Sequence, residues 1–599
     1  MVSRAGEHQA TVQIRFETLE LRGGSADGKR DPLKFVGRRV EVVDVDASGP
    51  DPVWLKPVDL DHTHIAMQHG LDPSESDPQF HQQMVYAVAM RTLEQFDRAL
   101  GRVVHFKGRR RLRLVPHAFR GGNAFYDRDM RAVLFGYFRA SKDAPGDNLP
   151  GQIIFTCLSH DIIAHEVTHA VVDRLRPNFN VATSPQVRAF HEGFADIVAI
   201  FQRLSFRDLV HRALQDARGD VRQSLLLSNI AAQFGQGLGS GKALRSALDS
   251  NTKVQDVPSE EHALGAVLVA AIFEGFYTTY ERRTADLLRI ATGGTGELPR
   301  GALHPDLVSR LTAECVRTAQ AVLTMCIRAF DYLPPTDVTF GAFLRALVTA
   351  DWELNPLDEV GLRAALIEAC RRRGIFATEA GSLAVDALLL DPASNSAWSA
   401  HVEEFKQWVD LAIRKDIEEQ RADTPEEPDA DEPDASAPPG LEQQTSMVQP
   451  DAAEPEEDLD SAKKLDEAIR TWFNGLSPAE RQQLGFSPHA PLKYPHFHSS
   501  RRVTAHGTVR FGLVVQLIQM QKVVSGAGPK DGFPWGATLV IDVSGDVRFV
   551  IAAPSISSRT AEIEQMQSTA MTNTLGWKLA APAADPFAVS YRGMHEART

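Results

Sequence analysis

Apolar and polar residues alternate along the first 60 positions, whereas farther along the chain the apolar residues recur at helical spacing. Every second residue is apolar in 11–16 and 39–43, which is the period of a strand with one buried face. We therefore predict that residues 1–60 form a β-rich segment, to which the sequence assigns no function. The pattern next predicts a helix at about 80–101, then strands at about 110–116 and 131–138 on either side of a turn at 123–127.

Long amphipathic helices are predicted from about 187 to 376. The clearest runs are 262–281, 305–330 and 339–351. With the strands before them they make residues 61–376 a domain of two lobes, one β-rich and one helical. A cleft between two lobes is where a small-molecule or peptide site is expected. Residues 377–417 are predicted to continue as a helical extension.

The composition changes sharply at 418–460, where Glu, Asp, Pro and Ala dominate. Such a segment cannot bury enough apolar surface to offset its ordering entropy, so we predict a disordered acidic linker. A role as an interaction tail is the alternative. Residues 461–599 are predicted to be a C-terminal α/β module that begins with a short helix at 461–474. Strands at 503–523 and 537–554 could pair, and the second folds back at Ser544-Gly545.

One predicted helix, which ends before Pro177, carries the strongest chemical signal. It contains His165-Glu166-x-x-His169, the HExxH pattern. Positions i and i+4 of a helix lie on the same face, so the two imidazoles can converge on one Zn²⁺ at about 2.0–2.1 Å. Glu166 is then left beside the metal as a base. The alternative is an amphipathic helix whose polar residues face solvent.

A second predicted helix supplies what a catalytic zinc site still needs, a third protein ligand. Glu192 follows His169 by 23 positions, and Asp196 lies one helical turn farther on. Glu192 can be the third ligand, and Asp196 can accept the hydrogen bond that orients a ligating imidazole. Alternatively, both are the solvated face of another amphipathic helix. Together the two motifs favour a single catalytic zinc.

At these residues the chain resembles the thermolysin-like metallopeptidases of the gluzincin clan. The resemblance covers roughly residues 75–376, and its motifs occur in the family's order. Besides the zinc residues, they are Asn123-Ala124-Phe125-Tyr126, Ala243-Leu244-Arg245-Ser246, Glu261-His262-Ala263-Leu264-Gly265 and the helical end of the domain at 332–351. The resemblance implies a multidomain α+β protein: a thermolysin-like two-lobe metallopeptidase, with the zinc site in its cleft, plus the C-terminal α/β module.

The resemblance also implies roles for individual residues. Asn123 and Ala124 would bind the substrate backbone as part of an edge strand. His262 would donate to the developing oxyanion, with Asp256 orienting it, and Arg245 would fix the substrate backbone and support the zinc ligands. The pocket for the residue after the scissile bond would be apolar, with a selectivity of about 1–3 kcal/mol per methylene. Its lining would be Phe155, Leu158, Ile162 and Leu244, all of which could instead be core residues.

Two departures from the family pattern stand out. The family often has a tyrosine that contacts the oxyanion between the second His and the ligand Glu, and none occurs here between His169 and Glu192. Tyr126 or Tyr137 could replace it, or the oxyanion has fewer donors. The family's calcium carboxylate falls at Arg203, a cation, so we do not expect a calcium site.

Composition narrows the partners and the compartment. The net charge is −14, which argues against a nucleic-acid partner. The basic run 109–113 is better explained by a solvated strand than by a polyanion site. No apolar signal region and no apolar run of about 18 residues are present, so we expect a cytoplasmic protein without a membrane span, with non-classical export as the alternative. The four cysteines are predicted to be buried free thiols.

These observations predict a zinc-dependent endopeptidase that hydrolyses peptides or proteins, with Glu166 as general base and a preference for a hydrophobic residue after the scissile bond. The alternative is a catalytically silent or highly target-specific binding or effector protein, related to toxins or defence, that keeps the metallopeptidase fold. In either case the C-terminal module could bind a protein partner. His489, His496 and His498 lie in a Pro-rich stretch and are predicted to be a packing loop rather than a metal site.

Overall fold

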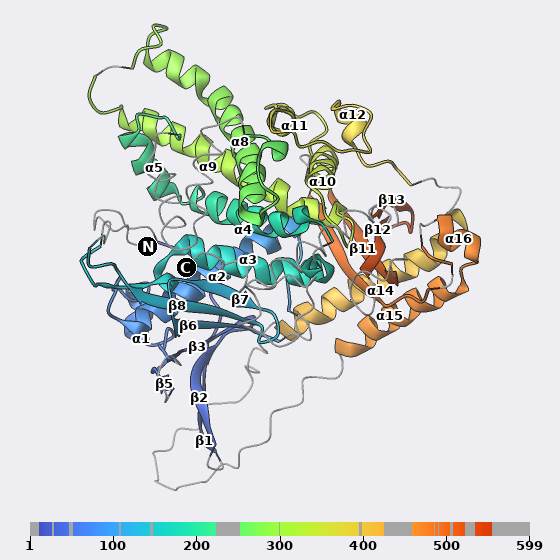
Figure 1. Cartoon of the computed structure of the whole chain (residues 1–599), viewed down its shortest axis with the longest axis horizontal. Helices are drawn as coiled ribbons and strands as arrows, with labels where there is room; N and C mark the ends of the chain where they lie inside the picture. Colours follow the sequence, from blue (N-terminus) through green and yellow to red (C-terminus); the bar gives the residue numbers. More distant parts are fainter. Residues whose placement is uncertain are drawn as a thin grey trace, which may run out of the picture.

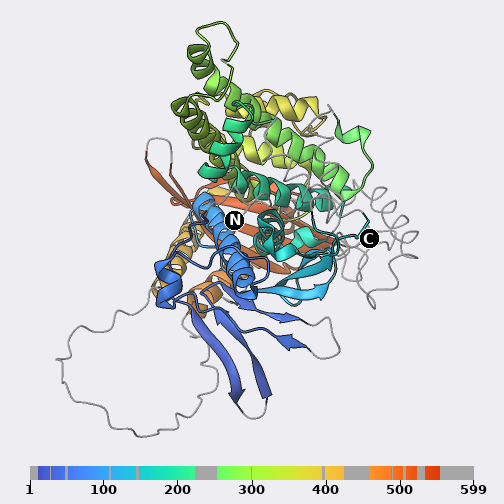
Figure 2. The ribbon, with the colours of Figure 1, turned by 90° about the vertical axis from the view of Figure 1, so that its left-hand side faces the viewer.

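A computed structural model describes most of the 599 residues, and all structural statements below concern the described part. The described residues are 11–26, 29–46, 52–106, 110–143, 148–181, 183–222, 252–298, 300–393, 398–423, 458–483, 486–488, 490–503, 507–521 and 533–553. They form an α+β protein in which a long N-terminal sheet, a group of helices and a C-terminal sheet are packed together (Figures 1 and 2).

A seven-stranded sheet forms the N-terminal part of the molecule. Its main path runs β1-β2-β3-β6-β8-β7, with β9 beside β8. The strands are β1 (Glu20–Ala26), β2 (Lys29–Val36), β3 (Val40–Val43), β6 (Leu112–Arg120), β7 (Ala124–Asp127), β8 (Ala132–Arg139) and β9 (Ile153–Phe155). Strands from the first 43 residues therefore continue the sheet of residues 112–155. The pairs β3–β6 and β6–β8 are parallel, and the others are antiparallel.

The turn that the residue pattern predicted at 123–127 is wrong, because Ala124–Asp127 is strand β7; the edge strand that the resemblance implied at these residues is present instead. The chain reverses earlier, at Gly121 and Gly122, and β7 then pairs antiparallel with β8. Hydrogen bonding to β8 outweighs the local turn signal. β7 is the last strand on the described path of the sheet. Two short strands, β4 (Val45–Asp46) and β5 (Val53–Trp54), form a separate pair, and α1 (Thr63–Met67) follows them.

The predicted helix at 80–101 is confirmed as α2 (Pro78–Leu100). The Asp77 side chain caps its first turn by accepting from the Gln79 N–H, and Gly101 ends it in the left-handed conformation with φ 69°. α2 packs on β3 and β6 and also on α3. It therefore joins the sheet to the helix that carries the HExxH residues.

Helices occupy most of residues 160–376, and the three clearest predicted runs are confirmed as α8, α9 and α10. The helices are α3 (His160–Leu175), α4 (Pro185–Arg203), α5 (Arg207–Asp216), α8 (Glu261–Ala291), α9 (Pro305–Arg328), α10 (Phe340–Trp352) and α11 (Leu362–Arg372). α4 packs between α3 and α8 (Figure 1). α8 is long and apolar enough to cross a membrane, but 83% of its apolar window is buried, as in a core helix.

The C-terminal part contains a four-stranded antiparallel sheet and its covering helices. The strands run in the order β10 (Tyr494–Val503), β11 (Val509–Gln521), β12 (Phe533–Asp542) and β13 (Val547–Ala552). The predicted pairing and the fold-back at Ser544-Gly545 are confirmed. His496 and His498 lie on β10, so their assignment to a loop was wrong; His489 lies outside the described residues.

Helices extend into both ends of the predicted acidic linker. α14 (Val402–Asp423) continues past residue 417, and α15 (Asp458–Gly475) begins before 461. The two helices pack against each other, and the Ser461 hydroxyl donates to the Glu418 carboxylate at 3.1 Å. Residues 424–457, the rest of the predicted linker, lie outside the described residues. The shorter helices in this region are α12 (Val385–Leu388) and α16 (Pro478–Gln483).

Both faces of the C-terminal sheet are buried. Leu539 and Ile541 of β12 belong to an aromatic-rich core with Trp408 and Trp472 of α14 and α15. Val540, between them, faces the other way and joins the main core of the molecule, as do Phe549 and Ile551 of β13. Successive strand residues point to opposite faces, so this alternation places the sheet between its own helices and the main body.

Candidate metal centre

His165 and His169 lie one turn apart on α3 and point to the same place. α3 is buried nearly along its whole length, and Ile163, Val167 and Val171 anchor it in the main core. The imidazoles are 2% and 0% exposed, and their Nε2 atoms are 3.0 Å apart. The helix geometry expected from the HExxH spacing is therefore present.

Glu192 on α4 completes a group of three donors. One carboxylate oxygen lies 3.5 Å from His165 Nε2 and the other 3.5 Å from His169 Nε2. Around a tetrahedral Zn²⁺ with bonds of about 2.0–2.1 Å, ligand atoms are about 3.3–3.4 Å apart. The observed separations of 3.0 to 3.5 Å match that figure. His165, His169 and Glu192 are thus a buried group that could hold a metal ion.

Asp196 and His262 contact this group from outside. Asp196 Oδ1 lies 2.9 Å from His165 Nδ1, so it accepts a hydrogen bond from that nitrogen and leaves the Nε2 lone pair directed at the other donors. His262, in the first turn of α8, places its Nδ1 3.3 Å from Glu192 Oε2. Three helices therefore contribute to the site.

Glu166 is fully buried beside the two histidines. Its Oε2 accepts a hydrogen bond of 3.0 Å from the backbone N–H of Tyr126, in β7. Burial raises the pKa of the Glu166 carboxyl to about 8, against the opposing effect of His165. A divalent cation bound next to it would lower that pKa again.

β7 is held against α3 at two points. Besides the bond from the Tyr126 N–H to Glu166, the Tyr126 hydroxyl donates to Asp173 Oδ2 at 3.1 Å. Arg128 also donates to Asp173, at 3.2 Å. Asp173 was missed by the sequence analysis, although its position one turn after His169 on the same helix face was a usable signal. These bonds fix the edge strand beside the metal-binding group.

Close packing of α4 on α8 brings His262 to Glu192. Gly193, next to Glu192, faces Gly265, one turn after His262. A Cβ atom on Gly193 would lie 2.8 Å from the Gly265 carbonyl oxygen, so any side chain at this position would force the two helices apart. The two glycines therefore allow the helix axes to approach closely enough for the side chains of residues 192 and 262 to meet.

The remaining predicted site residues lie in several places. Asn123 directly precedes β7, and its carbonyl oxygen accepts a hydrogen bond from the Gly136 N–H. Ala124, the first residue of β7, is buried. Asp256 is exposed, and its carboxylate accepts from the Lys253 N–H at 3.2 Å. Phe155, Leu158 and Ile162 pack on the main core. Leu244 and Arg245 lie outside the described residues.

The two tyrosines considered as oxyanion donors are engaged elsewhere. The Tyr126 hydroxyl donates to Asp173, and the Tyr137 hydroxyl donates to Asp46 at 2.8 Å. A histidine that the sequence analysis did not consider lies beside the group: the ring centroid of His191 is 5.9 Å from that of His169. Its Nε2 lies 3.2 Å from the carbonyl oxygen of Phe179. The only indication of His191 in the sequence was its position directly before Glu192.

Arg203, at which we did not expect a calcium site, forms a buried ion pair with Asp161 of α3. Asp161 Oδ1 also lies 3.2 Å from His160 Nδ1. The Arg203 guanidinium and the hydrogen bond from His160 hold the pKa of Asp161 below its usual range, although burial acts in the opposite direction. The pair connects the start of α3 to the end of α4, and so joins the two helices that carry the metal-binding group.

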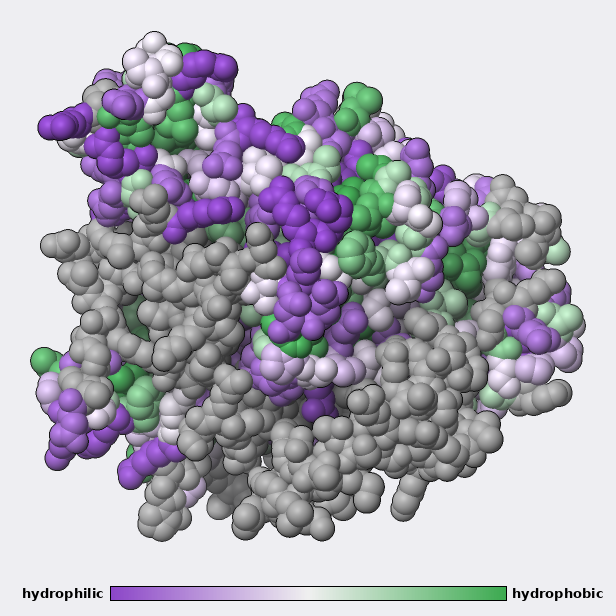
Figure 3. All heavy atoms as spheres, turned by 45° about the horizontal axis from the view of Figure 1, so that its top comes forward, coloured by the Kyte–Doolittle hydropathy of each residue, from purple (hydrophilic) through white to green (hydrophobic). Residues whose placement is uncertain are grey.

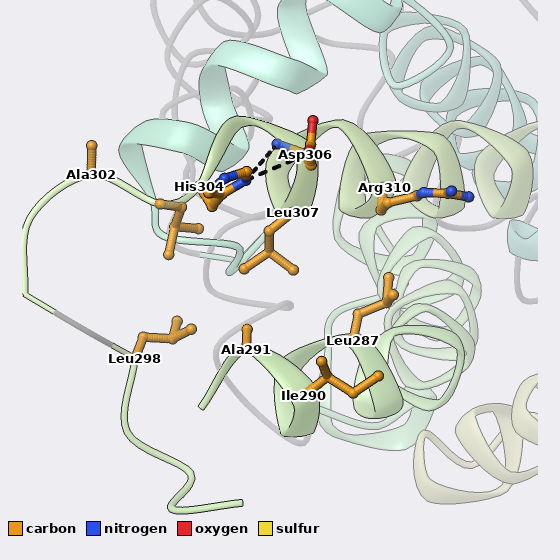
Figure 4. A pocket seen from close by; sticks show the side chains of 10 residues that line it. Leu287, Ile290, Ala291, Leu298, Ala302, His304, Asp306, Leu307 and Arg310 are labelled. Carbon is orange, nitrogen blue, oxygen red and sulfur yellow. Dashed lines mark hydrogen bonds and ion pairs between the residues drawn. The ribbon is translucent and has the colours of Figure 1, made fainter. Parts of the chain in front are cut away.

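A separate open pocket lies at the far end of the helical group. It has a volume of about 330 Å³ and lies between the end of α8 and the start of α9, where Leu287, Ile290 and Leu307 line it (Figure 4). Figure 3 shows apolar residues at this end of the two helices with hydrophilic residues around them. Its lining includes no residue of the metal-binding group.

No protein-family model matches the chain, and a search of curated proteins finds no match.

Proposed function

We propose that the protein is a zinc-dependent endopeptidase. The observation that carries the proposal is the meeting of His165, His169 and Glu192 from two helices at separations of 3.0–3.5 Å, with Glu166 buried next to them. Two imidazoles and one carboxylate are a ligand set of catalytic zinc sites, which keep a fourth position open. The resemblance of the surrounding motifs to thermolysin-like metallopeptidases supports the same conclusion.

Zinc, when bound, supplies a Lewis acid and lowers the pKa of water at the open position toward about 7. Glu166 then acts as general base: it accepts a proton from the attacking water as the C–O bond forms. It passes that proton to the leaving nitrogen as the C–N bond breaks. The bond from the Tyr126 N–H holds one carboxylate oxygen of Glu166 in place, which fixes the direction of the other.

The position of β7 supports a peptide substrate. It is the last strand on the described path of the sheet, and it lies against α3. An extended peptide can add to such an edge through main-chain hydrogen bonds, which fits the proposed roles of Asn123 and Ala124. His262, placed by its contact with Glu192, is the proposed donor to the substrate carbonyl oxygen as charge develops there.

The preference for a hydrophobic residue after the scissile bond remains part of the proposal. Phe155 and Leu158 are half-buried, so each keeps some surface beyond the core against which it packs. The ring of Phe155 also packs against that of His81, with the centroids 4.6 Å apart.

Glu166→Gln tests the proposal. The amide keeps the size of the side chain but cannot accept the proton, so we expect turnover of a quenched fluorescent peptide to fall by about 10²–10⁴-fold. Zinc content, measured by elemental analysis, should not change, since Glu166 is not a ligand. Glu403→Gln, an exposed change of the same kind on α14, is the matched control. Equal turnover by the Glu166→Gln and wild-type proteins would refute the mechanism.

A further inference from the structure

A second buried cluster of metal-ligand residues lies in the N-terminal part of the molecule. It consists of His81 on α2, His117 on β6 and Cys157 in the 3-10 turn Thr156–Leu158 that precedes α3. One donor atom from each lies within 4.8 Å of the others. The three residues are 1%, 4% and 0% exposed. Because its residues differ from those of the candidate active site, this cluster needs its own explanation.

The two imidazoles point at each other and are supported from behind. His81 Nδ1 lies 2.8 Å from His117 Nε2, and His117 Nδ1 lies 2.7 Å from Asp44 Oδ1. Gln82 in turn donates to the second oxygen of Asp44 at 2.8 Å. A carboxylate that accepts from one ring nitrogen leaves the lone pair of the other nitrogen free for a metal. The Asp196–His165 pair of the candidate active site has the same arrangement.

Two aromatic rings pack against the cluster. The ring of Phe155 lies 4.6 Å from that of His81 and 5.3 Å from that of His117, and the Tyr137 ring lies 6.3 Å from that of His117. A chain of hydrogen bonds from His81 through His117 to Asp44 pairs three of the four ring nitrogens of these two histidines. The Cys157 thiol lies in the same place but takes no part in that chain. A thiolate and two imidazoles are a set of ligands that zinc prefers.

We propose that His81, His117 and Cys157 supply three ligands of a second zinc ion, whose fourth position water would fill. At bond lengths of about 2.0–2.1 Å to nitrogen and 2.3 Å to sulfur, the two nitrogens would be about 3.3 Å apart, so the rings would separate by roughly half an ångström. The ion would fasten α2, β6 and the turn that leads into α3, three segments spread over 77 positions of the chain. Zinc binding at these three residues does not depend on the proposed peptidase activity.

Sulfur in the zinc coordination shell separates this site from the candidate active site, whose ligands are nitrogen and oxygen only. We would load the full-length protein with zinc alone, count the metal by elemental analysis and record X-ray absorption at the zinc edge. We expect two zinc ions per chain and a sulfur shell at about 2.3 Å that corresponds to one sulfur for two zincs. Glu192→Gln, which weakens the other site, should raise the sulfur fraction per zinc.

Cys157→Ser should remove the sulfur shell and one zinc, whereas Cys315→Ser, at another fully buried cysteine, should keep both. His81→Gln should lose the same zinc, and this second variant serves if the serine protein does not fold. A wild-type spectrum without sulfur would overturn the proposal and leave only the hydrogen-bonded chain. A sulfur shell that persists in Cys157→Ser would overturn it too. A single zinc with sulfur around it would uphold this site and refute the active-site metal.

Discussion

The glycine contact between α4 and α8 leads to a prediction that tests how the candidate site is assembled. In Gly193→Ala, the added Cβ would lie 2.8 Å from the Gly265 carbonyl oxygen and 3.1 Å from the Gly265 Cα. Non-bonded atoms of these kinds normally approach to about 3.5 Å. Both obstacles are backbone atoms of a helix and cannot turn aside as a side chain can. The helices must therefore separate by about half an ångström.

Two energies of opposite sign decide the result. Overpacking of this kind costs about 1–3 kcal/mol, whereas replacing glycine by alanine inside a helix contributes about 0.5–1 kcal/mol of stability. We expect a net loss of about 1–2 kcal/mol. The same displacement lengthens the 3.3 Å contact between His262 and Glu192. Because small misplacements near reacting groups cost up to about 100-fold, peptide turnover should fall by about tenfold or more.

The free energy of unfolding would be measured from urea denaturation followed by circular dichroism, and turnover with the peptide assay. Gly475→Ala is the matched control: this residue ends α15, is exposed, and has no atom within 4 Å of an added Cβ. Its stability should change by less than about 0.5 kcal/mol. If Gly193→Ala were as stable and as active as wild type, α4 and α8 would not approach closely at this point. The proposed position of His262 beside Glu192 would then be refuted.

Three further predictions concern other parts of the structure. Asp196→Asn should weaken zinc binding by about 10–100-fold, measured by competition with a chelating indicator; unchanged affinity would mean that the contact with His165 does not orient the ligand. Burial, with help from Arg102, lowers the pKa of His498 to about 3, so the stability linked to it is present above about pH 6.5 and is lost as pH falls toward 3. In His498→Gln the free energy of unfolding should fall less steeply between pH 6.5 and 3, by up to about 1.4 kcal/mol per pH unit. The same dependence on pH in the variant and the wild type would contradict this prediction. A chain that ends at residue 457 should unfold at lower urea concentration than the full chain and be cut faster by trypsin, since it lacks the C-terminal sheet that covers the main core.

The candidate metal-binding group of His165, His169 and Glu192 could be predicted because its geometry is local. His165 and His169 are four positions apart on one helix, and so are Glu192 and Asp196, so helix periodicity alone gives each pair a common face. That α3 and α4 then meet depends on apolar side chains that the amphipathic pattern also shows. By contrast, the approach of His262 to Glu192 depends on a glycine pair 72 positions apart, and no local pattern reveals it.

The predictions that failed concern segments whose structure depends on contacts with distant parts of the chain. Strand β7 has only four residues and follows two glycines, so its sequence indicates a turn until β8 is present to pair with it. The end of α14 is acidic enough to suggest a linker, but packing on α15 keeps it helical. The meeting of His81, His117 and Cys157 was not predicted either, because the three residues come from a helix, a strand and a turn at a spacing that matches no metal motif. Tertiary contacts decide each of these cases.

The C-terminal sheet contributes to the site in a way that sequence spacing could not show. The last four carbonyl groups of a helix need partners from outside the helix. At the end of α3 the Leu175 carbonyl accepts from the Gln516 side chain at 3.1 Å, across 341 positions of the chain. Thr538 of the same sheet donates to the Leu333 carbonyl at 2.8 Å. Since Val540 also enters the main core, the sheet braces the helix that carries both histidines. Its removal should therefore loosen the metal-binding group as well as lower overall stability.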